Sequence, residues 1–190
     1  PLVELFKNNT MTFVAGSSWQ PDEDLFIEYF NQHPEVKLVI APHVIDENHL
    51  VEIIRKLKRP YVRYTRADEK NVRKADCLII DCFGLLSSIY RYGEIAYIGG
   101  GFGVGIHNTL EAAVYGIPVI FGPKYQKFQE AIQLLEAKGA FSVKDYEELK
   151  TLLDRMLTDE VFLRESGMNA SNYVTGNAGA TDKIMSMINF

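Results

Sequence analysis

The sequence has 190 residues, of which 47% are hydrophobic and 24% charged, proportions that exclude an intrinsically disordered chain. Its net charge is −5 and no stripe of lysine and arginine is visible, which argues against a nucleic-acid partner. No apolar run reaches the ~20 residues that span a bilayer, and the N-terminus lacks the pattern of a signal peptide. We expect residues 1–190 to form a single domain, and interpret a sequence that begins at Pro1 without a methionine as part of a longer protein.

The two cysteines, Cys77 and Cys82, lie in or beside one apolar run. They have neither the CxxC spacing nor a second pair that would indicate a metal site. Residues five apart on one strand face opposite sides of a sheet and are too distant for a disulfide. We therefore expect two free thiols and a reducing compartment such as the cytoplasm.

Six short apolar runs alternate with segments long enough for a helix or a crossover. The predicted strands cover residues 11–15, 36–41, 61–64, 77–81, 94–98 and 118–121. Strands separated in this way are typical of βαβ units, which form parallel sheets. The sequence therefore predicts an α/β fold, a Rossmann-like doubly wound parallel sheet of about six strands with helices on both faces.

Helical patterns fall between these strands and continue beyond the last of them. They cover residues 22–32, 46–57, 109–115, 145–157 and 159–173, so that the chain ends in a helical tail. The helix over 109–115 is predicted to end at Gly116, a residue type that commonly follows a helix. Carboxylate pairs such as Glu23 and Asp24 are placed on polar helix faces, where they need no chemical role.

A glycine-rich loop follows the fifth predicted strand, with five glycines in the seven residues 99–105. The helix after it is predicted to open at His107 and Asn108. Glycines allow a backbone to approach a ligand closely, and the free N–H groups at a helix start favour an anion. The loop fits neither the GxGxxG pattern nor a P-loop. It is interpreted as an anion site, with a plain turn between strand and helix as the alternative.

The residues that end this loop have two interpretations each. Asn108 or Thr109 either contacts the ligand or caps the helix, and Glu111 either accepts ligand hydroxyls or complements the helix dipole. His107 either contacts the ligand or shapes the loop through a backbone hydrogen bond.

In an open parallel sheet, ligands bind at the carboxyl ends of the strands. Two further strand ends carry candidates there. Gly16, Ser17 and Ser18 either hold a second anion or form an ordinary serine-rich connection. Lys124 either lies near the ligand's negative charge or is a solvated lysine.

Taken together, the motifs resemble the C-terminal half of a Kdo transferase, the bacterial enzyme that moves 3-deoxy-D-manno-octulosonic acid (Kdo) from CMP-Kdo to a lipid A precursor. The resemblance runs from about residue 12 to 130. The motifs that carry it are Gly16-Ser17-Ser18, Ala41-Pro42-His43, Asp81-Cys82-Phe83-Gly84-Leu85, Gly99-Gly100, His107-Asn108 with Glu111-Ala112-Ala113, and the segment from Gly116 to Lys124 with Phe128.

The resemblance implies a GT-B glycosyltransferase, in which two Rossmann-like domains face each other across a cleft. This chain would be the donor-binding domain for CMP-Kdo, with Gly99, Gly100 and Asn108 receiving the phosphate and Glu111 the ribose hydroxyls. The implied donor-binding set is Gly16, Ser17, Ser18, His43, Gly84, Leu85, Gly99, Gly100, His107, Asn108, Thr109, Glu111 and Lys124.

The resemblance further implies inverting transfer without a metal or cofactor. The general base would lie in an N-terminal acceptor domain absent from this chain, so no residue here is assigned as catalytic. Only that missing domain would meet the lipid A precursor and the membrane. The enzyme would work in lipopolysaccharide assembly at the cytoplasmic side of the bacterial inner membrane, and this domain alone would be inactive.

One motif departs from the family pattern. Many Kdo transferases carry Pro-Arg-His where this sequence has Pro42-His43-Val44. Either His43, Arg66 or Lys124 supplies the missing positive charge, or the donor differs. The alternatives are therefore a GT-B transferase or epimerase that uses a UDP-sugar, and a non-catalytic interaction module.

Overall fold

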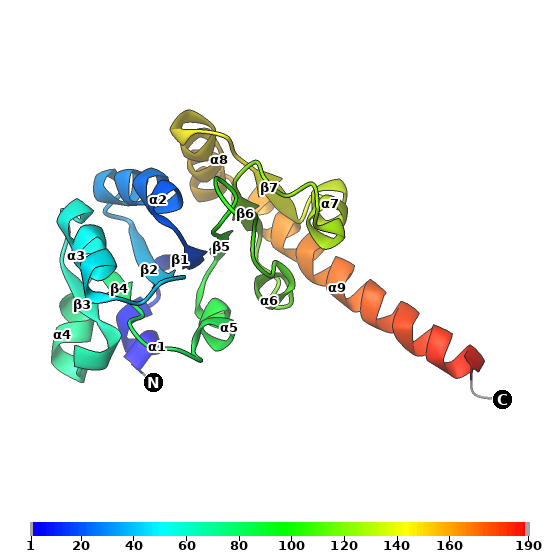
Figure 1. Ribbon diagram of the computed structural model, residues 1–190, viewed down its shortest axis with the longest axis horizontal. Coiled ribbons are helices and arrows are strands. Elements are labelled where there is room, and N and C mark those ends of the chain that lie inside the picture. Colours follow the sequence, from blue (N-terminus) through cyan, green and yellow to red (C-terminus); the bar gives the residue numbers. More distant parts are fainter. Residues whose placement is uncertain (1, 189–190) are drawn as a thin grey trace.

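A computed structural model describes the backbone of residues 2–188 and the side chains of residues 2–177. Its centre is one sheet of parallel strands in the order β3-β4-β2-β1-β5-β6-β7 (Figure 1). The strands are β1 (Met11–Ser18), β2 (Val36–Pro42), β3 (Tyr61–Arg63), β4 (Cys77–Ile79), β5 (Ile95–Ile98), β6 (Val119–Phe121) and β7 (Ala140–Ser142).

The predicted α/β fold is confirmed, and each of the six apolar runs contains a strand. The predicted number of strands was one too few, because the sheet has seven. The additional strand, β7, pairs in parallel with β6 at the edge of the sheet. It has only three residues, of which Ala140 alone is buried, and no strand was predicted over them.

Helices cover both faces of the sheet (Figure 1). They are α1 (Leu2–Lys7), α2 (Gln20–Gln32), α3 (Glu47–Lys56), α4 (Glu69–Lys74), α5 (Leu86–Ile89), α6 (Leu110–Ala113), α7 (Gln129–Glu136), α8 (Tyr146–Thr158) and α9 (Glu160–Ile188). Two 3₁₀ turns, η1 (Tyr64–Arg66) and η2 (Tyr90–Tyr92), complete the described elements. None of the helices in the described part of the chain is long and apolar enough to cross a membrane.

The core has two halves because neighbouring residues of a strand face opposite sides of the sheet. On β1, Phe13 and Ala15 pack with α2, α3 and α8, whereas Val14 packs with the other face, which α1, α4, α6 and α7 cover. Figure 1 shows α2 and α8 on one side of the strands and α5 and α6 on the other.

Cys77 and Cys82 are both free thiols.

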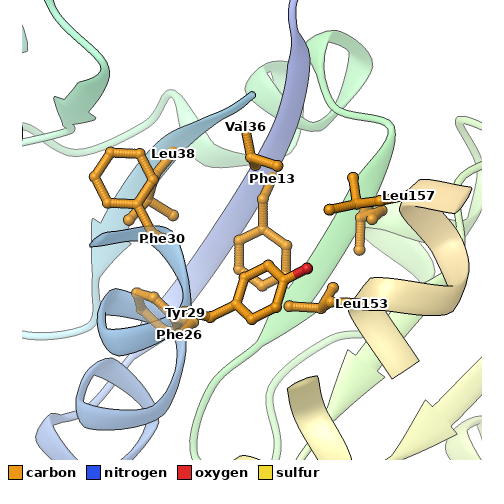
Figure 2. Close-up of a pocket in the computed structure, with 9 residues that line it drawn as sticks. Phe13, Phe26, Tyr29, Phe30, Val36, Leu38, Leu153 and Leu157 are labelled. Carbon is orange, nitrogen blue, oxygen red and sulfur yellow. The ribbon is translucent and has the colours of Figure 1, made fainter. Parts of the chain in front are cut away.

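An apolar pocket lies between α2, α8 and the sheet (Figure 2). The residues that line it are Phe13, Phe26, Tyr29, Phe30, Val36, Leu38, Ile95, Leu153 and Leu157. The polar atom among them, the Tyr29 hydroxyl, donates to Asp154 Oδ1 at 2.9 Å. Val36 and Ile95 are the first residues of their strands, so this pocket lies toward the amino ends of the strands, away from the edge where ligands bind.

The helix after the glycine loop is shorter than predicted. It covers Leu110–Ala113 rather than 109–115, and it begins after His107 and Asn108 rather than at them. The Asn108 side chain accepts from the Leu110 N–H at 3.0 Å and forms a turn of its own before the helix. After Val114 the hydrogen bonds tighten to the i→i−3 pattern, and Gly116, with φ of 71°, ends the segment as predicted.

Candidate functional site

The candidate site lies where the strand order changes direction. β1 stands between β2 and β5, with β2, β4 and β3 on one side of it and β5, β6 and β7 on the other. The register places Ser18 beside Pro42 and Gly16 beside Ile98. The loops that leave these three strands therefore meet at one point, which is the position of the ligand in open parallel sheets.

The end of β1 carries a bulge at Ser17, whose φ of 51° is unusual for a residue with a side chain. The next residue, Ser18, is fully buried, and its hydroxyl donates to Glu23 Oε1 at 2.9 Å. His49 Nε2 lies 2.9 Å from both oxygens of the same carboxylate. The Ser18 hydroxyl thus has its hydrogen-bond partner within the protein. The expectation that Glu23 lies on a polar helix face is wrong, because Glu23 is fully buried.

Two glycines allow the strand ends to pack closely. A Cβ atom at Gly99 would lie 2.3 Å from the carbonyl oxygen of Ser17 and 2.5 Å from Cα of Ser18. A Cβ atom at Gly16 would lie 1.9 Å from the hydroxyl oxygen of Tyr90. In both places, other atoms of the protein occupy the space in which a side chain would lie.

A buried carboxylate, that of Asp22 in the first turn of α2, joins these loops. It accepts from the Gly100 N–H at 2.9 Å, the Tyr97 hydroxyl at 2.9 Å and the Trp19 N–H at 3.0 Å. Burial raises the pKa of Asp22, although the three hydrogen bonds act in the opposite direction. Asp22 therefore ties the start of α2 to the end of β5 and to the glycine loop.

The glycine loop is closed by its own backbone. The carbonyl of Gly100 accepts from the N–H groups of Gly103 and Gly105, and the His107 N–H donates to the carbonyl of Gly99. Lys124 donates its backbone N–H to Gly101 and its Nζ to the carbonyl of Gly103 at 3.2 Å. The Gly99 N–H donates to Gly16, so the N–H groups of Gly99 and Gly100 are both paired within the protein.

The segment after the loop offers open polar groups. In the described contacts, the backbone N–H groups of Asn108 and Thr109 have no acceptor. Asn108 Nδ2 donates to Glu111 Oε1 at 3.3 Å, which orients the carboxylate. His107, Asn108 and Thr109 line a surface depression whose lining also includes Phe128 and Glu130.

A second depression lies on the other side of His43, between the ends of β1, β2 and β4. Its lining includes Ser17, His43, Phe83 and Gly84. Gly84 has φ of 84°, and the Phe83 side chain beside it is 81% exposed. Leu85 is half-buried at the start of α5. This depression combines an apolar floor with an exposed aromatic ring, as a nucleotide base requires.

A stack of three rings connects the two depressions, because His43 lines the second and His107 the first. The ring centroids of Trp19 and His43 are 4.6 Å apart, and those of His43 and His107 are 4.5 Å apart, with interplanar angles of 25° and 28°. Trp19 and Asp22 are absent from the residues that the sequence predicts for the site. The sequence signal for Trp19 was its position directly after Ser18, as the single tryptophan of the chain.

No protein-family model matches the chain. The 3-deoxy-D-manno-octulosonic acid transferase of Aquifex aeolicus is 34% identical over 151 residues, which cover 76% of this chain and 41% of that protein. The enzyme of the same name from Rickettsia felis is 32% identical over 190 residues, covering 95% of this chain and 40% of that protein. The crystal structure of the C-terminal CMP-Kdo binding domain of WaaA from Acinetobacter baumannii matches with a TM-score of 0.77 at 17% identity, over 91% of this chain and 97% of that one.

The fold is therefore that of one half of a GT-B glycosyltransferase. By sequence the chain is related to the Kdo transferases, which confirms the resemblance that its motifs indicate. The chain spans about two fifths of the length of these two relatives.

Proposed function

We propose that this chain is the donor-binding domain of a Kdo transferase and that it holds CMP-Kdo at the carboxyl edge of the sheet. The observation that carries the proposal is the meeting of the loops after β1, β2 and β5 at the switch point. It is supported by the relationship to the Kdo transferases and by the likeness to a domain described as binding CMP-Kdo.

The roles of the residues follow from their contacts. The open N–H groups of Asn108 and Thr109 meet the phosphate, and the Glu111 carboxylate, held by Asn108, accepts the ribose hydroxyls. The base lies in the depression that Phe83 and Gly84 line, next to Leu85 in the chain. Gly16, Ser18, Gly99 and Gly100 support the site through packing and internal hydrogen bonds rather than by touching the donor.

The reaction itself needs groups beyond this chain. We place the acceptor domain and its general base in the part of the relatives' length that this chain does not span. With that partner half, the enzyme transfers Kdo with inversion and without a metal to a lipid A precursor, at the cytoplasmic side of the inner membrane. Alone, the chain binds the nucleotide and does not turn over.

Titration of the folded chain with CMP, followed by calorimetry or NMR shifts, tests this function. We expect saturable binding of CMP and weaker binding of UMP, because the donor of a Kdo transferase carries cytosine. A folded chain that shows no binding at millimolar CMP contradicts the proposal. Preference for UMP or UDP would instead support a transferase that uses a UDP-sugar.

Replacement of Glu111 by glutamine should weaken CMP binding by about ten- to a hundredfold, because hydrogen bonds to a charged group contribute about 1.5–3 kcal/mol. The matched control is Glu147→Gln, which changes an exposed acid in the first turn of α8. Calorimetry on both variants gives the comparison. Equal CMP affinity in Glu111→Gln and the native chain would remove Glu111 from the binding site.

A further inference from the structure

The middle ring of the stack, His43, comes from the motif in which many Kdo transferases have an arginine. Of the three cations that the sequence offers in its place, Arg66 follows β3 and is separated from β1 by β4 and β2. Lys124 uses its Nζ to hold the carbonyl of Gly103. His43 lies at the switch point itself, against His107.

The two outer rings of the stack each carry an unused polar atom. His107 Nε2 and Trp19 Nε1 are buried and have no hydrogen-bond partner among the described residues. An unpaired buried polar group costs about 1–3 kcal/mol, so such atoms mark places where a partner is missing. His107 also lines the depression that contains the open N–H groups of Asn108 and Thr109.

Charged and titratable groups surround His107 on several elements. His43 faces it from the end of β2 and Asp22 from α2, while Glu130 of α7 lines the same depression. Burial lowers the pKa of His107, the neighbouring His43 lowers it further, and Asp22 acts in the opposite direction. Without a ligand, His107 is therefore neutral near pH 7, and the site lacks a fixed cation at this point.

We infer that His43 and His107 form the phosphate-recognising pair of this site, and that it takes up a proton from solvent when the phosphate of a nucleotide binds. A phosphate within hydrogen-bond distance favours the charged form of an imidazole, whereas the second ring of the pair disfavours it. The ligand thereby supplies the counter-charge that the stack lacks. The inference rests on the proposed function and adds a pH dependence that a fixed arginine would not give.

Calorimetry of CMP binding in buffers with different enthalpies of ionisation counts these protons. At about pH 7.5 the phosphate of CMP is already a dianion, because its second pKa is about 6, so any proton taken up goes to the protein. We expect uptake of up to about one proton per CMP, and none with cytidine, which has no phosphate. Affinity for CMP should fall as the pH rises from about 6.5 to 8.5.

The variant His107→Gln should lose most of the proton uptake and flatten the pH dependence. His43→Gln removes the ring that lowers the pKa of His107, so the fall in CMP affinity should move to higher pH. His43 is exposed, so His43→Gln keeps the test open if His107→Gln fails to fold. The control is His33→Gln, which changes a histidine that stacks on Tyr29 at the end of α2. It should bind CMP with unchanged proton uptake.

CMP binding with a heat that does not depend on the buffer would overturn the inference and leave the proposed function intact. Uptake that persists in His107→Gln, or a pH dependence that does not move in His43→Gln, would also overturn it. A folded native chain that does not bind CMP would contradict the proposed function, and the inference would fall with it.

Discussion

Replacing Gly99 by alanine should strongly destabilise the protein. The new Cβ would lie 2.3 Å from the carbonyl oxygen of Ser17, a backbone atom that cannot turn aside. β1 and β5 would have to separate at the switch point, where Gly99 also donates its N–H to Gly16. Overpacking in a core typically costs about 1–3 kcal/mol, and a backbone clash at the centre of a sheet belongs at the upper end or above it.

The control for this prediction is Gly103→Ala in the same loop. Nothing lies within 4 Å of a Cβ atom at Gly103, and its φ is not positive. Its free energy of unfolding, measured with urea, should stay within about 0.5 kcal/mol of the native value. If Gly99→Ala is as stable as Gly103→Ala, the close packing of the two strand ends is not real.

Replacing Asp22 by alanine should be nearly as damaging. The change leaves the Gly100 N–H, the Tyr97 hydroxyl and the Trp19 N–H without their acceptor in a buried place. Each unpaired donor costs about 1–3 kcal/mol, so the total loss is at least about 3 kcal/mol. Urea unfolding followed by circular dichroism measures this loss directly.

Asp24 of the same helix provides the matched control. Its carboxylate is half-exposed and makes a surface ion pair with Lys56. Such pairs contribute about 0–1 kcal/mol, so Asp24→Ala should change the free energy of unfolding by less than about 1 kcal/mol. Equal losses in the two variants would show that the Asp22 contacts do not hold the loops together.

The ionisation of Asp22 should also appear in the pH dependence of stability. Burial raises the pKa of Asp22 in the folded state, so above pH 3.8 the native chain binds more protons than the unfolded chain. The contribution of Asp22 to the free energy of unfolding therefore falls as the pH rises from 3.8 through the raised pKa of the folded state. Asp22→Asn should lack that slope, and the difference between the two urea-unfolding profiles against pH isolates it.

The fold was largely predictable because its signals are local. Buried parallel strands are runs of apolar residues, and six of the seven strands were predicted from such runs. β7 was not predicted, although it has as many buried residues as β3, which was. The short helices α1, α4, α5 and α7 were not predicted, since four to eight residues give little periodicity.

Of the candidate site, only the meeting of the loops at the carboxyl ends of the strands could be predicted. Parallel strands end at one edge, so the convergence of the loops after β1, β2 and β5 followed from the fold. The buried carboxylates did not, because an acid in the first turn of a helix usually faces solvent. Asp22 finds its partners Tyr97 and Gly100 at separations of 75 and 78 residues, which no local pattern reveals.

The glycines also have a structural role that the sequence did not indicate. The sequence indicated a backbone that a ligand approaches, and the structure shows backbone approaching backbone. Gly101 illustrates this, because a Cβ atom there would lie 2.6 Å from Gly122 at the end of β6. Close approach between distant segments depends on how the strands pair, which a single sequence does not display.

The closed glycine loop has a consequence for the entropy of binding. A loop so rich in glycine would lose much conformational freedom if a ligand had to order it. Here Gly100, Lys124 and the Asp22 carboxylate already hold its backbone through internal hydrogen bonds. The loop therefore loses its conformational entropy during folding and not during binding. A small anionic ligand with few contacts can then bind a surface that is already ordered.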